Sequence, residues 1–226
     1  QGPPPRRART PPAAAAAAAM RVLGLTGSIG MGKSACAAVL RDAGVPVADA
    51  DAAVHELYAP GGAAVEPVAA AFGREVLGGD GGVDRRALGA LVVGNDAAMK
   101  TLEGVVHPLV AAHRERWLEE RDAEGHEVVV LDVPLLYETR LDCAGVLDAV
   151  LVVSAPEAAQ RERVLARPGM SAAKLDAILA KQMPDEEKRR RADVVIDTGC
   201  SMEDTKAALL TVLEEQRRIA RQARAQ

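Results

Sequence analysis

The sequence contains few aromatic residues, and this shortage excludes one class of partner. Its 226 residues include one tryptophan, two tyrosines and one phenylalanine, which are scattered along the chain. Binding of single-stranded nucleic acid needs neighbouring aromatic rings on which bases stack. The chain also carries a net charge of −4, whereas nucleic-acid binding normally requires a basic face. We therefore expect no nucleic-acid partner.

Cysteine is also sparse, and long apolar runs are missing. Cys36, Cys143 and Cys200 lie far apart and form no C-x-x-C pair, which favours a reducing compartment, the cytoplasm. The four histidines show no metal-site spacing, so no zinc site is predicted. No apolar run approaches the ~20 residues that a membrane span needs. We expect no membrane contact.

Residues 1–19 differ from the rest of the chain in composition. They contain Arg6, Arg7 and Arg9, no acidic residue, and a tract of seven alanines. Such an arginine-rich, acid-free segment resembles an organellar transit peptide, which would place the protein in an organelle. The proline and alanine bias fits a disordered leader equally well, or a sequence upstream of a true start at Met20. We exclude residues 1–19 from the predicted fold.

Residues 27–34 read GSIGMGKS and fit the pattern G-x-x-x-x-G-K-[ST] at every fixed position. An apolar, strand-prone run at residues 20–26 precedes the motif, and an alanine-rich, helix-prone stretch at residues 35–43 follows it. This context supplies a strand, a tight loop and a helix N-terminus in the order that a phosphate-binding loop requires. The sequence therefore predicts a nucleoside triphosphate site.

The residue types in this motif explain the chemistry. Glycines let the backbone curl so that successive N–H groups point at phosphate oxygens, and the following helix adds the positive end of its dipole. Lys33 can reach the β- and γ-phosphates, and the hydroxyl of Ser34 can ligate Mg²⁺. The predicted nucleotide-binding residues of the loop are Gly27, Ser28, Ile29, Gly30, Met31, Gly32, Lys33 and Ser34.

The wider pattern predicts an α/β fold. Strands are expected in five short apolar segments, at residues 21–25, 45–48, 128–133, 148–154 and 193–197, and helical patterns alternate with them. This alternation predicts a five-stranded parallel sheet covered by helices on both faces. Residues 52–122 look helical without a strand, so we expect a helical insertion within a domain that spans residues 20–222 and leaves a short tail at residues 223–226.

Two acids and two arginines outside the loop bear on mechanism. Asp49 and Asp51 follow the second predicted strand, at the edge where open α/β sheets bind ligands. One of them could orient an acceptor hydroxyl and take its proton, and either could instead cap the next helix. Arg163 and Arg167 are four residues apart, so we predict that they share one helix face. That face could clamp a triphosphate or could simply be solvated.

Several nucleotide-dependent classes fit poorly. The chain lacks the N-K-x-D guanine-binding motif and a D-x-x-G after the third predicted strand, which disfavours a GTPase, and it is too short for large motor or transporter ATPases. A small-molecule kinase remains. The open alternatives are another nucleoside or metabolite kinase with the same loop, and a nucleotide-binding module that catalyses nothing.

Eight segments in order resemble the dephospho-CoA kinase family. The resemblance is collinear from about residue 20 to residue 213, and only the phosphate loop among the segments is specific by itself. The segments are LTGSIGMGKS at 25–34, VADAD at 47–51, DRRAL at 84–88, HPLV at 107–110, DVPLLYE at 132–138, QRERVLAR at 160–167, Gln182, and RADVVIDTG at 191–199.

The resemblance implies an activity and assigns roles to matching residues. The implied reaction uses ATP and Mg²⁺ to phosphorylate the ribose 3′-hydroxyl of dephospho-coenzyme A, the last step of coenzyme A synthesis. By the same resemblance, Lys33 is the catalytic loop lysine and Asp51 the catalytic base. Arg163 matches an arginine at the transferring phosphoryl group, and Arg167 a second arginine of a lid at about residues 157–191.

The resemblance also points to the acceptor substrate. It implies that the helical insertion holds the acceptor through Arg85 and His107, together with Asp49, although His107 could instead start or cap a helix. Thr198 stands where many relatives have an asparagine near the adenine, and Asp132 resembles a metal-site acid at the end of the third strand; both roles stay open. The expected partners are small-molecule substrates, and the expected assembly is a monomer or a weak homo-oligomer.

Overall fold

The structure is a computed structural model that describes residues 20–225, so the predictions for residues 1–19 lie outside it. The described chain divides into two compact units. The first, which we call the sheet unit, joins residues 20–47 to residues 125–225. The second, the helical unit, spans residues 48–124.

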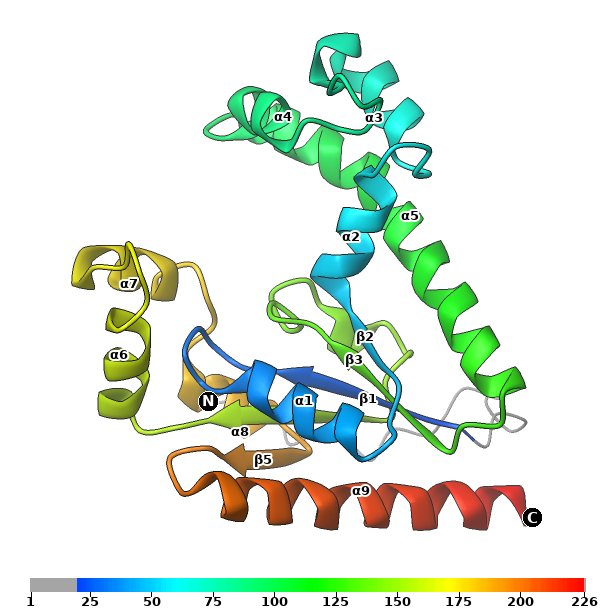
Figure 1. The fold of residues 1–226 in the computed structure, drawn as a ribbon, viewed down its shortest axis with the longest axis vertical. Coiled ribbons are helices and arrows are strands. Elements are labelled where there is room, and N and C mark those ends of the chain that lie inside the picture. Colours follow the sequence, from blue (N-terminus) through cyan, green and yellow to red (C-terminus); the bar gives the residue numbers. More distant parts are fainter. Residues whose placement is uncertain (1–19, 226) are drawn as a thin grey trace, which may run out of the picture. The chain divides into compact units, whose positions relative to one another are not determined.

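The centre of the sheet unit is a five-stranded sheet in the order β2-β3-β1-β4-β5 (Figure 1). The strands are β1 (Arg21–Thr26), β2 (Val47–Asp49), β3 (Val128–Asp132), β4 (Ala149–Ser154) and β5 (Val194–Asp197). β1 pairs in parallel with β3 and β4, and β4 pairs in parallel with β5. The predicted five-stranded parallel α/β fold is confirmed. Because β1 is the central strand, the loop that follows it opens at the middle of the sheet edge.

Apolar side chains cover both faces of the sheet. Leu23 and Leu25 of β1 belong to a core that α1 (Lys33–Asp42) and α9 (Met202–Arg224) close from one side. On the other side, Gly24 lies against Leu136 and Leu147, which come from the connection between β3 and β4. Burial on both faces explains why the central strands read as continuous apolar runs rather than as alternating patterns.

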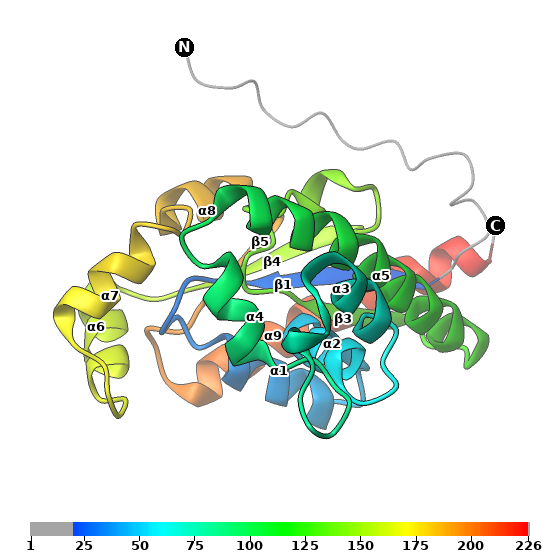
Figure 2. The ribbon, with the colours of Figure 1, turned by 90° about the horizontal axis from the view of Figure 1, so that it is seen from above.

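The helices that follow β4 form the segment at residues 157–191 that we call the lid. α6 (Glu157–Leu165) and α7 (Ala172–Leu179) project beyond the end of the sheet (Figure 2), whereas α8 (Asp185–Arg191) packs against β4. Ser171 caps α7 by accepting a hydrogen bond from the Lys174 N–H. The side chain of Asp185 accepts a hydrogen bond from the Ser154 hydroxyl, 2.6 Å away. The last helix of the lid, α8, is therefore in contact with the sheet at β4.

The helical unit has a core of its own. Its helices are α2 (Ala50–Tyr58), α3 (Val65–Phe72), α4 (Arg85–Val92) and α5 (Asp96–Ala123), with a short 3₁₀ turn at Arg74–Val76. Asp84 and Asn95 cap α4 and α5 through their side-chain oxygens. Apolar side chains from all four helices, among them Leu57, Val68 and Leu88, form one buried cluster.

One helix boundary differs from the sequence prediction. The alternative that His107 starts or caps a helix is wrong, because α5 begins after Asn95 and runs through both His107 and Pro108. A proline inside a helix removes one backbone hydrogen bond. Val106 is buried in the core of the helical unit, with Leu109 and Val110 packed against that core, and this packing sustains the helix across the proline.

Of the helices within residues 20–225, none combines the length and the apolar character that a membrane span requires.

Candidate active site

The phosphate loop at residues 27–34 joins β1 to α1 in a conformation that needs glycine. Gly30 and Gly32 have φ values of 78° and 88°, in the left-handed region that other residues rarely adopt. Gly27 is constrained differently, because a Cβ there would lie 2.4 Å from the Val153 side chain of β4. Gly32 is also the N-cap residue of α1, so the loop ends at the positive end of a helix dipole. The loop has the shape of an anion-binding cradle.

Lys33, the first residue of α1, meets a buried carboxylate. Its Nζ lies 2.5 Å from Oδ1 of Asp132, which ends β3 and is only 3% exposed. Asp132 therefore fixes the loop lysine at the carboxyl edge of the sheet, and a role for Asp132 in metal binding stays a prediction. The same carboxylate acts on Cys36, one turn into α1: burial, and secondarily the charge of Asp132, raises the pKa of its thiol to about 11. Cys36 thus stays protonated at neutral pH and is a packing residue.

Arg163 of α6 binds the turn that follows β5. Its guanidinium donates to the carbonyl of Thr198 at 2.6 Å and to the Thr198 hydroxyl at 3.3 Å. The hydroxyl of Thr198 donates in turn to the carbonyl of Met31 in the phosphate loop, at 2.7 Å. Thr198 thus connects the lid to the loop. Its hydroxyl is used within the protein, and a contact of Thr198 with the adenine stays a prediction.

The prediction that Arg163 and Arg167 share a helix face is wrong. α6 ends at Leu165, and Arg167 lies beyond the C-cap residue Ala166 in the following turn. The physical reason is Pro168, which disfavours helical backbone at the residue before it. Arg167 remains exposed in the lid, so a role at the triphosphate stays a prediction. Arg161 instead pairs with Asp176 of α7, at 2.9 Å, and holds two lid helices together.

Asp49 and Asp51 occupy different positions at the start of the helical unit. Asp49 is the N-cap residue of α2, and its Oδ1 accepts hydrogen bonds from the N–H groups of Asp51 and Ala52, at 2.8 and 3.1 Å. Asp51 lies in the first turn of α2 and is exposed. Capping accounts for Asp49 without any substrate, so its contact with an acceptor stays a prediction. The carboxylate of Asp51 is in no such cap and is accessible for chemistry.

The two other predicted acceptor residues also lie in the helical unit. Arg85 is the exposed first residue of α4, next to the capping Asp84. Burial raises the pKa of the Tyr58 phenol, and the nearby charge of Arg85 partly offsets the rise. His107 is exposed on α5, and His113, further along α5, contacts Glu56 of α2 at 3.1 Å. The helical unit therefore presents several cationic or titratable groups, with Arg85 and His107 both accessible.

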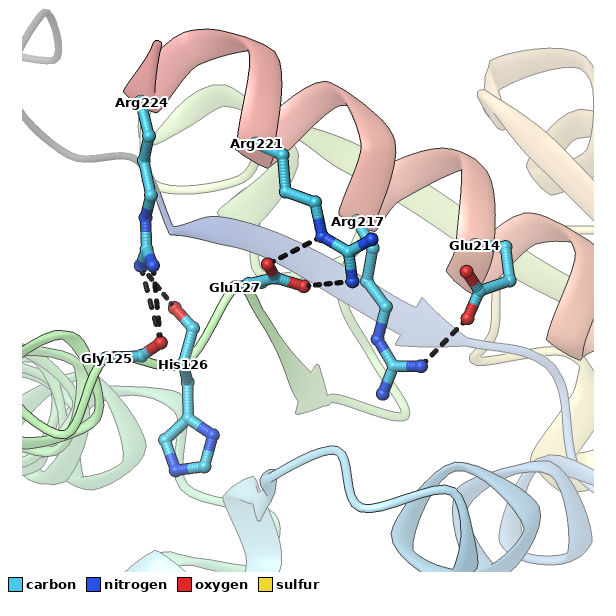
Figure 3. Close-up of polar contacts among 7 residues, drawn as sticks. All are labelled: Gly125, His126, Glu127, Glu214, Arg217, Arg221 and Arg224. Carbon is cyan, nitrogen blue, oxygen red and sulfur yellow. Dashed lines mark hydrogen bonds and ion pairs between the residues drawn. The ribbon is translucent and has the colours of Figure 1, made fainter.

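The arginines of α9 serve the fold rather than this site. Arg221 forms a two-pronged ion pair with Glu127, which precedes β3, and its hydrogen bond lowers the pKa of that carboxyl (Figure 3). Arg224 donates to the carbonyls of Gly125 and His126. These contacts lie at the amino end of β3, whereas the phosphate loop follows the carboxyl end of β1. They anchor α9 and present no cradle for a nucleotide.

A loop of this geometry, opening at the carboxyl edge of a parallel sheet and contacted by a helical lid, places the chain among the P-loop kinases of small molecules. Comparison with known proteins narrows the class. A family model described as dephospho-CoA kinase matches residues 21–204. The chain belongs to the dephospho-CoA kinase family.

Individual relatives agree in sequence and structure. The chain is 53% identical over 198 residues to the dephospho-CoA kinase of Mesorhizobium japonicum, covering 88% of this chain and 98% of the relative. A crystal structure from Thermus thermophilus is 40% identical, with a TM-score of 0.72 over 87% of this chain and 97% of the other. Dephospho-CoA kinase from Campylobacter jejuni is 25% identical, with a TM-score of 0.62 and coverage of 88% and 98%.

Sequence reasoning gave no role to two glutamines that touch the loop. Gln160 and Gln182 both stand in segments that carry the family resemblance, and in the structure both bind the backbone of Ile29. Their position in those segments is the one sequence signal that could have marked them as functional residues. Their partner could not be inferred, because it lies more than a hundred residues away in the chain.

Proposed function

We propose that the chain transfers the γ-phosphoryl group of ATP to the ribose 3′-hydroxyl of dephospho-coenzyme A and releases coenzyme A and ADP, the last step of coenzyme A synthesis. The observation that carries the proposal is the GSIGMGKS loop between β1 and α1, in a chain that belongs to this kinase family. Further support comes from a relative covered over 98% of its length, which bears the name dephospho-CoA kinase.

The proposed roles in the sheet unit follow from charge. Backbone N–H groups of the loop surround the β- and γ-phosphates, except those of Ile29 and Met31, which donate to Gln182 and Ser28. Lys33 neutralises charge between the two phosphates. Arg163 and Arg167 stabilise the charge that spreads over the equatorial oxygens of the transferring group. Arg163 is bound to Thr198 beside the loop, which supports a place for it at the nucleotide.

The proposed roles in the helical unit concern the acceptor. Asp51 orients the 3′-hydroxyl and takes its proton as the new bond to phosphorus forms. Its exposed position in the first turn of α2, next to the capping Asp49, supports this assignment. Arg85 and His107, both exposed, bind the acceptor, whose phosphate groups suit cationic partners.

Magnesium fits the donor set of the loop. Within residues 20–225 no group of three or more histidine, cysteine or acidic side chains could hold a metal ion. Mg²⁺ is commonly bound by one or two protein oxygens together with substrate phosphates. The exposed hydroxyl of Ser34, at the start of α1, is the side chain proposed to bind it. Mg²⁺ bound there would neutralise phosphate charge.

The direct test is a mass-spectrometric assay of the purified chain with ATP, Mg²⁺ and dephospho-coenzyme A. The expected result is a gain of about 80 Da on the acceptor, the mass of one phosphoryl group. Nucleoside monophosphates and shikimate serve as control acceptors and should remain unmodified. Phosphorylation of a control acceptor in place of dephospho-coenzyme A would indicate another metabolite kinase, and ATP binding without any product would indicate a non-catalytic module.

The same proposal covers the cellular location and the oligomeric state of the enzyme. We place it in the cytoplasm, which the three free cysteines suit. A monomer or a weak homo-oligomer is expected in solution, and sedimentation analysis checks this.

A further inference from the structure

The peptide groups around Ile29 are bound from both ends of the lid. The side-chain amide of Gln160, in α6, donates to the Ile29 carbonyl at 2.7 Å. The Ile29 N–H donates to Oε1 of Gln182, which follows α7, at 3.1 Å. The two amide orientations are fixed by their partners, because a backbone carbonyl only accepts and a backbone N–H only donates. Ile29 therefore accepts one hydrogen bond from the lid, at Gln160, and donates one to the lid, at Gln182.

Each glutamine is held in place by its own surroundings. Gln160 is 4% exposed, and its helix lies directly on the loop, since a Cβ on Gly30 would be 2.5 Å from the Val164 side chain. Gln182 is half-buried, and the N–H of the next residue, Met183, donates to Glu138 at 2.8 Å. Glu138 forms an ion pair with Lys188, which is fully buried. The two side chains are thus fixed donors and acceptors rather than mobile surface groups.

The contact matters because an anion-binding loop works only when its N–H groups are already aimed at the ligand. Rotation of the peptide groups on either side of Ile29 would redirect the neighbouring amides of the loop. We propose that Gln160 and Gln182 are positioning residues that hold the phosphate loop in its binding shape and make that shape depend on the seating of the lid. This inference rests on the proposed nucleotide site.

The polarity of the two bonds gives a matched pair of variants. Gln160→Glu and Gln182→Glu each add one negative charge beside the loop. Only the second keeps its bond, because a carboxylate accepts from the Ile29 N–H but cannot donate to the Ile29 carbonyl. We expect Gln160→Glu to raise the KM for ATP on the order of tenfold more than Gln182→Glu, the factor that one hydrogen bond contributes.

Uncharged variants complete the test. Gln160→Met and Gln182→Met keep the side-chain length and lose the bond, so each should raise the KM for ATP several-fold while the KM for dephospho-coenzyme A stays constant. Amide hydrogen exchange at Ile29 should accelerate in Gln182→Met. Gln222→Met, on the exposed side of α9, is the control and should match the wild type.

Two outcomes would overturn the inference. In the first, the methionine variants lower the unfolding midpoint but leave both the KM for ATP and Ile29 exchange unchanged, which would assign the glutamines to folding alone. In the second, the two glutamate variants behave alike, which would make charge rather than hydrogen bonding the cause. Failure of the wild type to bind ADP in a titration would instead overturn the proposed nucleotide site, and the inference with it.

Discussion

Asp49 and Asp51 show how two identical residues, two positions apart, acquire different tasks. The oxygen of Asp49 that faces α2 is used by two backbone N–H groups, which fixes the start of the helix. Asp51 lies in the first turn of the same helix. A cap of this kind contributes about 1 kcal/mol to stability, so Asp49 holds in place the element on which the proposed base stands.

Replacing Asp51 tests the base directly. We expect Asp51→Asn to reduce turnover by roughly 10²–10⁴-fold, the range of general acid–base catalysis, because the amide cannot accept the proton. ATP binding should stay near the wild-type value. Steady-state kinetics and an ADP titration measure the two effects. Full turnover in the variant would show that another group takes the proton.

A second residue-scale prediction compares two arginines of α6. Arg163 contacts Thr198 beside the loop, whereas Arg161 pairs with Asp176 inside the lid. Arg163→Met should lower turnover on the order of 10³-fold if its charge acts on the transferring group. Arg161→Met should change turnover little, since a surface ion pair contributes at most about 1 kcal/mol. Equal effects on turnover from the two variants would contradict the assignment to Arg163.

At the scale of elements, the contact between α6 and the phosphate loop depends on Gly30. In Gly30→Ala the new methyl meets Val164 and the backbone has a φ of 78°, so the left-handed strain of about 1–2 kcal/mol adds to overpacking of about 1–3 kcal/mol. Gly169→Ala is the control, because its φ is 75° but nothing lies within 4 Å. Urea denaturation should show a larger decrease in the free energy of unfolding for Gly30→Ala than for Gly169→Ala. Equal decreases would contradict the close contact between Gly30 and Val164.

The ion pair between Glu138 and Lys188 links α8 of the lid to the connection between β3 and β4. It predicts that the free energy of unfolding depends on pH. Burial raises the pKa of the Glu138 carboxyl, but hydrogen bonds from the Met183 and Glu138 N–H groups and the charge of Lys188 outweigh it and set the pKa below the ordinary 4.5. Because the folded pKa is lowered, the stabilisation is complete above pH 4.5 and is lost as the pH falls through the folded value.

Glu138→Gln should therefore lower the free energy of unfolding at pH 7 by roughly 3–5 kcal/mol, as for a buried charge left without its partner, and flatten the acid side of the stability curve. Glu127→Gln removes an exposed pair with Arg221 and should cost at most about 1 kcal/mol. Chemical denaturation at several pH values measures both. A Glu138→Gln curve parallel to that of the wild type would contradict this.

Helices were predictable from local signals to the extent that caps and prolines define them. Asp84, Asn95 and Ser171, all residue types that favour this position, are N-caps in the structure. The prediction for Arg167 failed because helical spacing was assumed up to the residue before Pro168, whereas α6 ends at Leu165. The interpretation of His107 as a helix start failed because burial of apolar neighbours outweighed the proline signal.

At the scale of the whole molecule, the sheet could be predicted but the lid contacts could not. Apolar runs and a phosphate motif report on local conformation, so they revealed the strands and the loop. The bonds of Gln160, Gln182 and Thr198 to the loop join residues that are distant in sequence, and no local pattern encodes them.

Ligand binding should stabilise the folded chain as a whole. ADP at about 100 times its dissociation constant should add ~2.7 kcal/mol to the free energy of unfolding. A thermal scan with and without ADP detects this as a higher midpoint. Lys33→Met, compared with its own ligand-free scan, should lose most of the shift, and an unchanged shift would place the nucleotide away from Lys33.

The buried ammonium of Lys188 also constrains how the chain can change over evolutionary time. A single replacement of Glu138 leaves the buried Lys188 ammonium without its partner, and a single replacement of Lys188 leaves the Glu138 carboxylate without its own. Either intermediate therefore lowers the free energy of unfolding. Exchange of both for an apolar pair would avoid that cost. Among descendants of this sequence, the two positions should therefore mutate jointly or remain fixed.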